Sequence, residues 1–317
     1  MRIDVHAHLF PSEYLALLGR LGLSAGAGFI AELHGGASAT EIRDRLAMMD
    51  RAGVDKEILS VPFAVPSTTD EKKAVAAARY VNDAYADIVR RYPGRFAAFA
   101  TVPLPFVDAA IAETGRALDK LGMVGVVTTT ELSGKPLADP AFHRFFAELD
   151  RRQAVLFIHP SGSSVHSPPI ADFTWSIGAP FEDTLCLLQL VKADIPRQFP
   201  RVKIISAHLG GCAPFLMERL AHHDVLPASR APQRPALSEA EAKWFYYDTV
   251  NGHPSALRCA RETLGADRLL MGTDIPFNRG DSHQKMVEYV AKAELSTEDV
   301  AAIYGGNALR LFGSRLG

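Results

Sequence analysis

Two histidines separated by a single residue, His6 and His8, end an apolar segment near the start of the chain. Because side chains alternate between the two faces of a β-strand, a strand over these residues would present both imidazoles on one face. Two neighbouring imidazoles can share one metal ion, although two polar residues at a strand end would look the same. The pair alone does not decide between these interpretations.

Three further apolar segments end in a residue that could bind a metal ion, namely His159, His208 or Asp274. For any one of them, burial or capping of the following helix would be a sufficient explanation. Five imidazole or carboxylate groups at the ends of four strands instead favour a common site, if the fold brings those ends together. Neutral imidazole and carboxylate are the usual ligands of catalytic zinc, so the pattern predicts a metal centre.

Short apolar segments alternate with segments of helical spacing along the chain, and this order predicts how the candidate ligands are positioned. Eight segments have the composition of strands buried on both faces: Ile3–His8, Glu57–Val61, Phe96–Val102, Met123–Thr128, Val155–His159, Val202–His208, Phe245–Thr249 and Leu269–Asp274. Seven segments have helical spacing: Thr40–Arg51, Lys72–Arg91, Ala109–Leu121, Pro140–Arg152, Glu182–Ile195, Pro214–His222 and Pro254–Leu264.

This alternation predicts an α/β fold, the (β/α)8 TIM barrel, with an active site at the C-terminal ends of the strands. A doubly wound open sheet is the alternative, and the first turn lacks the glycine-rich phosphate loop typical of that fold. The chain of 317 residues shows no internal repeat and no dividing linker, so we expect a single domain over 1–317.

Three segments, 11–38, 161–180 and 224–242, do not fit the simple alternation. Long loops inside a compact domain are usually functional or disordered. The first two follow strands at the end of a barrel where active sites lie. The third is rich in proline and alanine, and it could form a flap or an oligomer contact.

Composition excludes several classes of function. The net charge is −2 with both signs mixed, so neither a nucleic-acid surface nor a membrane-binding polybasic run is expected. No apolar stretch is long enough to span a bilayer, and His6 and His8 interrupt the opening segment that a secretory signal would need. Three cysteines without CxxC spacing suit free thiols in a reducing compartment. We therefore expect a cytoplasmic protein.

Eight sequence segments together resemble the amidohydrolase superfamily, and most closely its decarboxylase branch, typified by 2-amino-3-carboxymuconate 6-semialdehyde decarboxylase. In chain order they are IDVHAHLFP (3–11), MDRAGVDKEILSVP (49–62), RFAAFATVPL (95–104), LFIHPSG (156–162), IISAHLGGCAPFLMERL (204–220), YDTVNGHPSAL (247–257), LLMGTDIPF (269–277) and GGNALRLF (305–312). The resemblance runs through most of the chain, and it implies a barrel enzyme with a metal centre.

The resemblance also implies a role for each candidate residue. His6, His8, His159 and Asp274 correspond to the ligands of one divalent metal ion, with zinc expected and manganese as the alternative. Asp274 could in addition orient a water on the metal, and His208 corresponds to the acid/base beside it. The family further implies a homodimer.

Trp175 and Phe277 correspond to aromatic residues that line the substrate pocket of the family, although ordinary packing would explain either of them. Binuclear members of the superfamily usually carry a carboxylated lysine at the end of the fourth strand. Here that strand ends at Thr128, and the first lysine after it is Lys135, expected in a loop. We therefore expect one metal ion rather than two.

The branch binds substrate carboxylates with arginines, one of them from the loop after the first strand, and no arginine lies between Gly22 and Thr40. Another cation would have to take its place, and the candidates are Arg45, Arg51, Arg279 and, from a neighbouring subunit, Arg230 or Arg234. The identity of the substrate is therefore open.

The expected function is non-oxidative decarboxylation of a small, planar, carboxylated substrate. The alternative is a metal-dependent hydrolase of the same superfamily that cleaves a C–N, C–O or C–C bond, because the same metal-bound water could attack an electrophilic carbon. A non-catalytic barrel used for binding or assembly would predict the loss of one or more site residues, and all of them are present.

Overall fold

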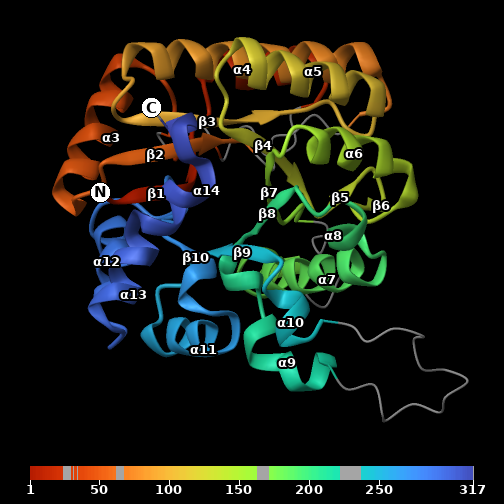
Figure 1. The fold of residues 1–317 in the computed structure, drawn as a ribbon. Coiled ribbons are helices and arrows are strands. Elements are labelled where there is room, and N and C mark those ends of the chain that lie inside the picture. Colours follow the sequence, from red (N-terminus) through yellow and green to blue (C-terminus); the bar gives the residue numbers. More distant parts are fainter. Residues whose placement is uncertain are drawn as a thin grey trace, which may run out of the picture.

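The computed structural model describes residues 1–23, 30, 32–33, 35–61, 68–162, 171–221 and 237–316. Within these ranges eight parallel strands form one sheet, in the order in which they follow along the chain (Figure 1). They are β1 (Ile3–His8), β2 (Lys56–Ser60), β3 (Phe96–Thr101), β4 (Gly125–Thr129), β7 (Val155–His159), β8 (Lys203–Ser206), β9 (Phe245–Asp248) and β10 (Leu269–Leu270).

The sheet closes on itself between the first and the last strand. Ala7 forms a parallel bridge with Ile275, and the amide of Val5 donates to the carbonyl of Met271 at 2.9 Å. A closed parallel sheet with a helix after most strands is the (β/α)8 barrel, so the fold predicted from the sequence is confirmed.

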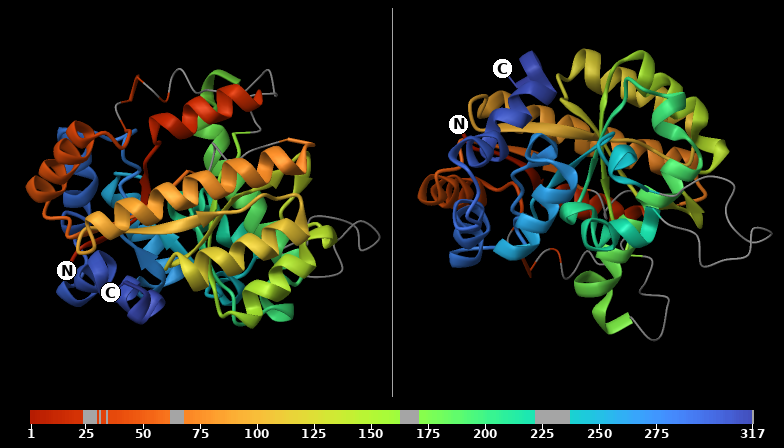
Figure 2. Two further views of the ribbon diagram at one scale, coloured as in Figure 1. Left: turned by 90° about the horizontal axis from the view of Figure 1, so that it is seen from above. Right: turned by 60° about the horizontal axis from the view of Figure 1, so that its bottom comes forward.

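Helices surround the strands on the outside of the barrel (Figure 2). The longer ones are α1 (Ser12–Leu21), α3 (Ala39–Ala52), α4 (Glu71–Arg91), α5 (Val107–Lys120), α6 (His143–Arg151), α7 (Ala179–Lys192), α9 (Ala213–Ala221), α11 (Pro254–Leu264) and α12 (Asp281–Ala291). Shorter elements are α8 (Ile195–Gln198), α10 (Glu239–Ala242), α13 (Thr297–Ala301), α14 (Asn307–Phe312) and the hairpin of β5 (Glu131–Leu132) and β6 (Lys135–Pro136).

Local signals in the sequence explain where the helices begin and end. Ser38 and Glu41 form a capping box at the start of α3, and Gly53 ends this helix in the left-handed conformation. The segment 11–38 was expected to be irregular, yet it contains α1. This helix buries Tyr14 and Leu18, which are four residues apart and therefore share a face.

The apolar core has two layers. Inside the barrel, side chains from the strands pack on one another and on the C-terminal segment, which contributes Phe312 and Leu316. The outer layer lies between the barrel and the helices. Because the C-terminal segment fills the end of the barrel where the chain begins, the opposite end is left for chemistry. None of the described helices is both long and apolar enough to cross a membrane.

Candidate metal centre and active site

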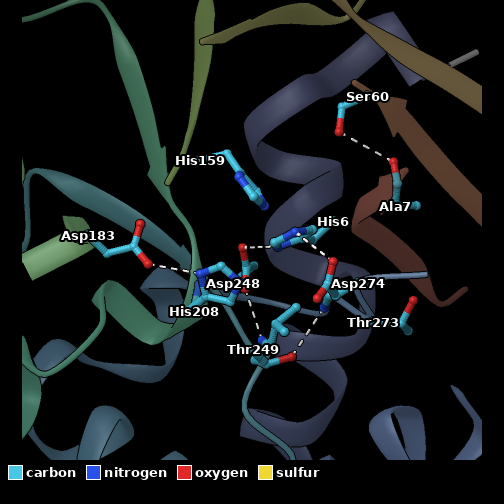
Figure 3. Close-up of polar contacts among 12 residues, drawn as sticks. His6, Ala7, Ser60, His159, Asp183, His208, Asp248, Thr249, Thr273 and Asp274 are labelled. Atoms are coloured by element: carbon cyan, nitrogen blue, oxygen red, sulfur yellow. Dashed lines mark hydrogen bonds and ion pairs between the residues drawn. The ribbon is translucent and has the colours of Figure 1, made fainter. Parts of the chain in front are cut away.

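Four side chains meet at the C-terminal ends of the barrel strands, and Figure 3 labels three of them, His6, His159 and Asp274. They are His6 and His8 of β1, His159 of β7, and Asp274 in the segment that follows β10, and their ligand atoms all lie within 4.8 Å of one another. The Nε2 atoms of His6 and His8 are 3.0 Å apart, and Asp274 Oδ1 lies 3.4 Å and 3.1 Å from them. The residues predicted from the strand ends are thus brought together.

A bulge in β1 allows both histidines to point into the barrel. The pairing of β1 with β2 shifts register between Asp4 and Ala7. Val5 belongs to the core inside the barrel, so strict alternation would turn His6 outward. The irregularity instead places Ala7 outside, against Met48, and leaves His6 facing inward.

Each imidazole is held through its Nδ1 atom by an oxygen of the protein. The contacts are His6 to Asp248 Oδ2 at 2.7 Å, His8 to Ser60 Oγ at 3.0 Å and His159 to the Pro160 carbonyl at 2.9 Å. A carboxylate or a carbonyl accepts but does not donate, so His6 and His159 carry a proton on Nδ1. Metal-binding histidines are oriented in this way, with Nε2 as the ligand atom.

The donor set fits a metal ion. Three imidazole nitrogens and one carboxylate oxygen are the ligand types of catalytic zinc. Asp274 Oδ1 is buried and makes no hydrogen bond to any residue that the structure describes, although it is in contact distance of two imidazoles. Electron-rich atoms this close repel one another unless a positive charge lies between them, so a cation would account for the arrangement.

Burial and neighbouring charges shift the pKa values of the three imidazoles in different directions. Burial lowers the pKa of His8 to about 4, and burial together with the nearby imidazoles holds the pKa of His159 well below its usual value. Burial also opposes protonation of His6, but Asp248 and Asp274 outweigh it and raise the pKa of His6 to about 10. A metal ion would compete with this proton, because both need the lone pair of Nε2.

His208 lies beside the four candidate ligands but is not one of the groups that meet within ligand distance. Its ring centroid is 5.2 Å from that of His6 and 5.5 Å from that of His159. Its Nδ1 lies 2.8 Å from Asp183 Oδ2 of α7 (Figure 3). Burial opposes protonation of this imidazole, but the Asp183 carboxylate outweighs it and raises the pKa of His208. The position suits an acid/base adjacent to a metal.

Two strands end before the residues that they were predicted to carry. The prediction that strands run to His208 and Asp274 is wrong, because β8 ends at Ser206 and β10 at Leu270. Both functional residues have left-handed backbone, with φ of 52° and 60°. Each costs about 1–2 kcal/mol for a residue other than glycine, and such strain concentrates at functional sites.

Two glycines allow the segments beside His208 and Asp274 to pack closely against their neighbours. A Cβ at Gly272 would lie 2.9 Å from the Cβ of His6, and one at Gly211 would lie 1.9 Å from the carbonyl oxygen of Pro180. Neither contact is compatible with a side chain. The glycines therefore let the turn after His208 and the segment before Asp274 approach the site.

Sequence reasoning missed two carboxylates that organise the site. Asp248, at the end of β9, receives a hydrogen bond from His6 Nδ1 and, through Oδ1, from the amide of His208 at 3.0 Å. Asp183 is fully buried in α7 and holds His208. A signal did exist for Asp248, since it is the last residue but one of the predicted strand Phe245–Thr249. Asp183 lies within a helix, where a carboxylate is ordinarily solvent-exposed.

Of the two aromatic residues predicted to line the substrate pocket, Phe277 has a ring contact with a candidate ligand. The ring of Phe277 lies 5.9 Å from that of His8. Trp175 lies in a π-helical turn, Thr174–Gly178, and a Cβ at Gly162 would be 2.9 Å from its ring. The indole therefore lies against Gly162, three residues after His159. Their contact with substrate remains a prediction.

The arginines considered as substrate-binding cations do not converge on one point as the candidate metal ligands do. Arg45 lies outside the barrel, where it donates to Glu57 Oε2 at 2.6 Å and to the carbonyl of His8 at 2.7 Å. Arg51 and Arg279, together with Arg45, line a cavity of about 410 Å³ between α3 and the segment that follows Asp274. Arg230 and Arg234 lie outside the described residues.

The fourth strand and the hairpin after it bear on the number of metal ions. Lys135 was expected in a loop, but it lies in the β5–β6 hairpin and its side chain is exposed. The fourth strand itself, Gly125–Thr129, contains no lysine. One metal ion per chain remains a prediction.

Fold and site together define a (β/α)8 barrel with a candidate metal centre and an adjacent histidine–aspartate pair at the C-terminal ends of its strands. The amidohydrolase family model matches residues 3–314, and the chain belongs to this family.

Comparison with known proteins bears on the choice between a decarboxylase and a hydrolase. The gamma-resorcylate decarboxylase of Rhizobium radiobacter is 31% identical, over 86% of this chain and 87% of its own length. The 2-amino-3-carboxymuconate-6-semialdehyde decarboxylase of Dictyostelium discoideum is 26% identical, over 99% and 92%. A solved 2,6-dihydroxybenzoate decarboxylase, in complex with 2,6-dihydroxybenzoate, superposes with a TM-score of 0.82 at 27% identity, covering 98% of both chains. These relatives favour a decarboxylase over a hydrolase.

Proposed function

We propose that this protein is a metal-dependent, non-oxidative decarboxylase, a carboxy-lyase, of a small planar carboxylated substrate. One observation carries the proposal: a cluster of three imidazoles and a carboxylate stands beside a buried histidine–aspartate pair, in a chain whose relatives are decarboxylases. The match of the family model to residues 3–314 further supports one domain over the chain.

His6, His8, His159 and Asp274 would hold one divalent ion, with zinc preferred because imidazole predominates among the donors. When bound, the ion would act as a Lewis acid that binds and polarises oxygen atoms of the substrate. The chain's own groups then orient the substrate and move protons. Phe277 beside His8 and Trp175 against Gly162 would present apolar ring faces to a planar substrate.

His208 would supply the proton that replaces the carboxyl group. Its Nε2–H is delivered to the carbon that bears the carboxylate, forming a C–H bond and leaving the imidazole neutral. The C–C bond to the carboxylate then breaks, its electron pair returns to the conjugated system, and CO2 departs. Asp183 fixes the ring through Nδ1 and stabilises its positively charged form before the transfer.

The substrate class is tested by measuring CO2 release from a panel of acids with the zinc-loaded and the manganese-loaded protein. The panel consists of 2,6-dihydroxybenzoate and 2-amino-3-carboxymuconate 6-semialdehyde, on which the relatives act, and of simple lactones as hydrolase substrates. We expect CO2 from at least one planar acid, and no ring opening of the lactones. Lactone hydrolysis without any CO2 release would favour the hydrolase alternative.

We also infer that the protein is a homodimer, with an exposed apolar surface as the contact. Large apolar side chains are exposed along the segment 173–185, and Phe215 of α9 is 84% exposed. Large exposed apolar surfaces on a protein usually mark an interaction site. The neighbouring subunit could then supply the arginine that the first loop lacks.

The dimer is tested with Phe181→Asp and Phe215→Asp, separately and together. Charges in an apolar contact should convert the dimer to a monomer, as measured by light scattering during gel filtration. Leu309→Asp is the matched control, since Leu309 is exposed on α14, away from 173–185 in the sequence. A wild-type monomer at micromolar concentration, or a dimer that survives the double substitution, would contradict the inference.

The three cysteines, Cys186, Cys212 and Cys259, are all free thiols. This agrees with the reducing compartment that their spacing suggested. The cytoplasmic location itself remains a proposal.

A further inference from the structure

A second cluster of buried charged groups lies outside the barrel wall, behind the candidate metal centre. Asp4 of β1 and Glu57 of β2 are register partners on adjacent strands, and His283 of α12 approaches both, with ligand-type atoms of the three within 4.8 Å of one another. Arg45 of α3 pairs with Glu57. All four side chains are buried, and the proposed mechanism uses none of them.

The Asp4 carboxylate accepts hydrogen bonds from the backbone at or beside two of the candidate ligands. Its Oδ1 accepts the amide of His6 at 3.0 Å and the amide of Thr273 at 3.1 Å, and its Oδ2 accepts the hydroxyl of Thr273. Thr273 directly precedes Asp274, whose own amide donates to the carbonyl of His6 at 2.8 Å. One carboxylate thus joins β1 to the last strand segment at the bulge that turns His6 inward.

A second member of the cluster, Arg45, contacts the backbone of another candidate ligand. Arg45 joins Glu57 at 2.6 Å and the carbonyl of His8 at 2.7 Å, so it fixes the backbone of a third candidate ligand. Burial and the nearby arginines lower the pKa of His283 to about 4, and this imidazole is therefore neutral. The fixed positive charge in the cluster is the guanidinium of Arg45.

We propose that Asp4 is a positioning residue of the metal centre, which sets the placement of His6 and Asp274 through their backbone, while Arg45, paired with Glu57, fixes the backbone of His8. The left-handed backbone of Asp274 supports this role, because strained residues persist where their surroundings over-determine them. The inference rests on the proposed metal site. A second cation bound by Asp4, Glu57 and His283 is disfavoured, since Arg45 already places a fixed positive charge against Glu57.

The test measures metal affinity and ligand geometry, not turnover. Purified full-length protein is stripped with a chelator and titrated with Zn²⁺, and the visible spectrum of the Co²⁺-substituted protein reports the geometry of the ligands. Asp4→Ala should weaken Zn²⁺ binding by about 10- to 100-fold, the range for residues that orient ligands, and it should shift the Co²⁺ spectrum. Asp4→Asn, which retains one acceptor oxygen, should recover part of the affinity.

Two further variants separate positioning from loss of stability. Thr273→Val removes the hydroxyl that Asp4 Oδ2 accepts and leaves the amide, so it should shift the Co²⁺ spectrum even if Asp4→Ala does not fold. Asn82→Ala is the control, because Asn82 is equally buried and bridges α4 to Thr101 and Glu113, and none of these contacts is to a candidate ligand. It should destabilise the protein to heat and leave the Co²⁺ spectrum unchanged.

The outcomes distinguish this inference from the proposed function. Wild-type protein that binds no Zn²⁺ or Co²⁺ would remove the metal centre and both proposals with it. Metal binding by the wild type, with unchanged affinity and spectrum in Thr273→Val and in folded Asp4 variants, would overturn the positioning role alone. A second ion per chain that is lost in Asp4→Ala would also overturn it, in favour of a cation site in the cluster.

Discussion

Replacement of His208 by alanine is expected to lower the turnover number by about 10²-fold or more, the scale of general acid–base catalysis, while the metal content stays close to one ion per chain. The imidazole lies beside the candidate ligands but outside the group that meets within ligand distance. Removing it should therefore abolish proton delivery and leave the metal in place. The measurement pairs steady-state kinetics with elemental analysis of the same protein preparation.

Two companion variants sharpen this prediction. Asp183→Asn keeps the shape of the partner but removes the charge that favours the protonated imidazole, so it should lower turnover by less than His208→Ala does. His253→Ala, at an exposed histidine before α11, should leave both turnover and metal content unchanged. If His208→Ala stripped the metal as thoroughly as a ligand substitution does, His208 would be a ligand and its proposed role would be wrong.

His159→Ala is expected to lose metal and activity together. This residue supplies one of four converging donors, and its Nδ1 is already committed to the carbonyl of Pro160. Without its Nε2 the remaining three donors bind the ion too weakly to retain it through purification. Elemental analysis should find about one zinc or manganese ion per wild-type chain and much less in the variant, with His6→Ala and His8→Ala behaving alike.

Metal removal from the wild type gives an independent readout of the same site. A bound ion that prefers the folded state raises stability by mass action, so chelation should lower the melting temperature, and added Zn²⁺ should restore it. The same chelation should barely affect His159→Ala. Two tightly held ions per wild-type chain, or none after reconstitution, would contradict the mononuclear centre.

The positions of the ligands could be predicted because each ends an apolar strand. His6, His8 and His159 lie in β1 and β7 with the predicted bounds, and parallel strands that surround one axis must bring their ends together. The roles of the residues came from the resemblance to the family rather than from spacing. Strand composition and family likeness were therefore both needed to predict the site.

What could not be predicted depends on contacts between distant segments. The bulge between Asp4 and Ala7 has no local signal, since IDVHAH reads as a regular strand. The left-handed backbone of His208 and Asp274, which lie beyond the ends of β8 and β10, is not indicated by the apolar segments that lead to them. Asp183 reaches His208 from a helix 25 residues away in the sequence. Such partners emerge only from the folded structure.

The central claim is that the protein releases CO2 from a carboxylate with the help of a bound metal ion. The most direct test follows the best substrate of the panel, labelled with ¹³C in its carboxyl group, through a full reaction in ¹⁸O-enriched water. We expect stoichiometric ¹³CO2 and a product with hydrogen in place of the carboxyl group, formed by metal-loaded but not by chelated protein. A product that keeps its ¹³C and gains ¹⁸O in a new carboxylate or alcohol, without CO2, would contradict the claim.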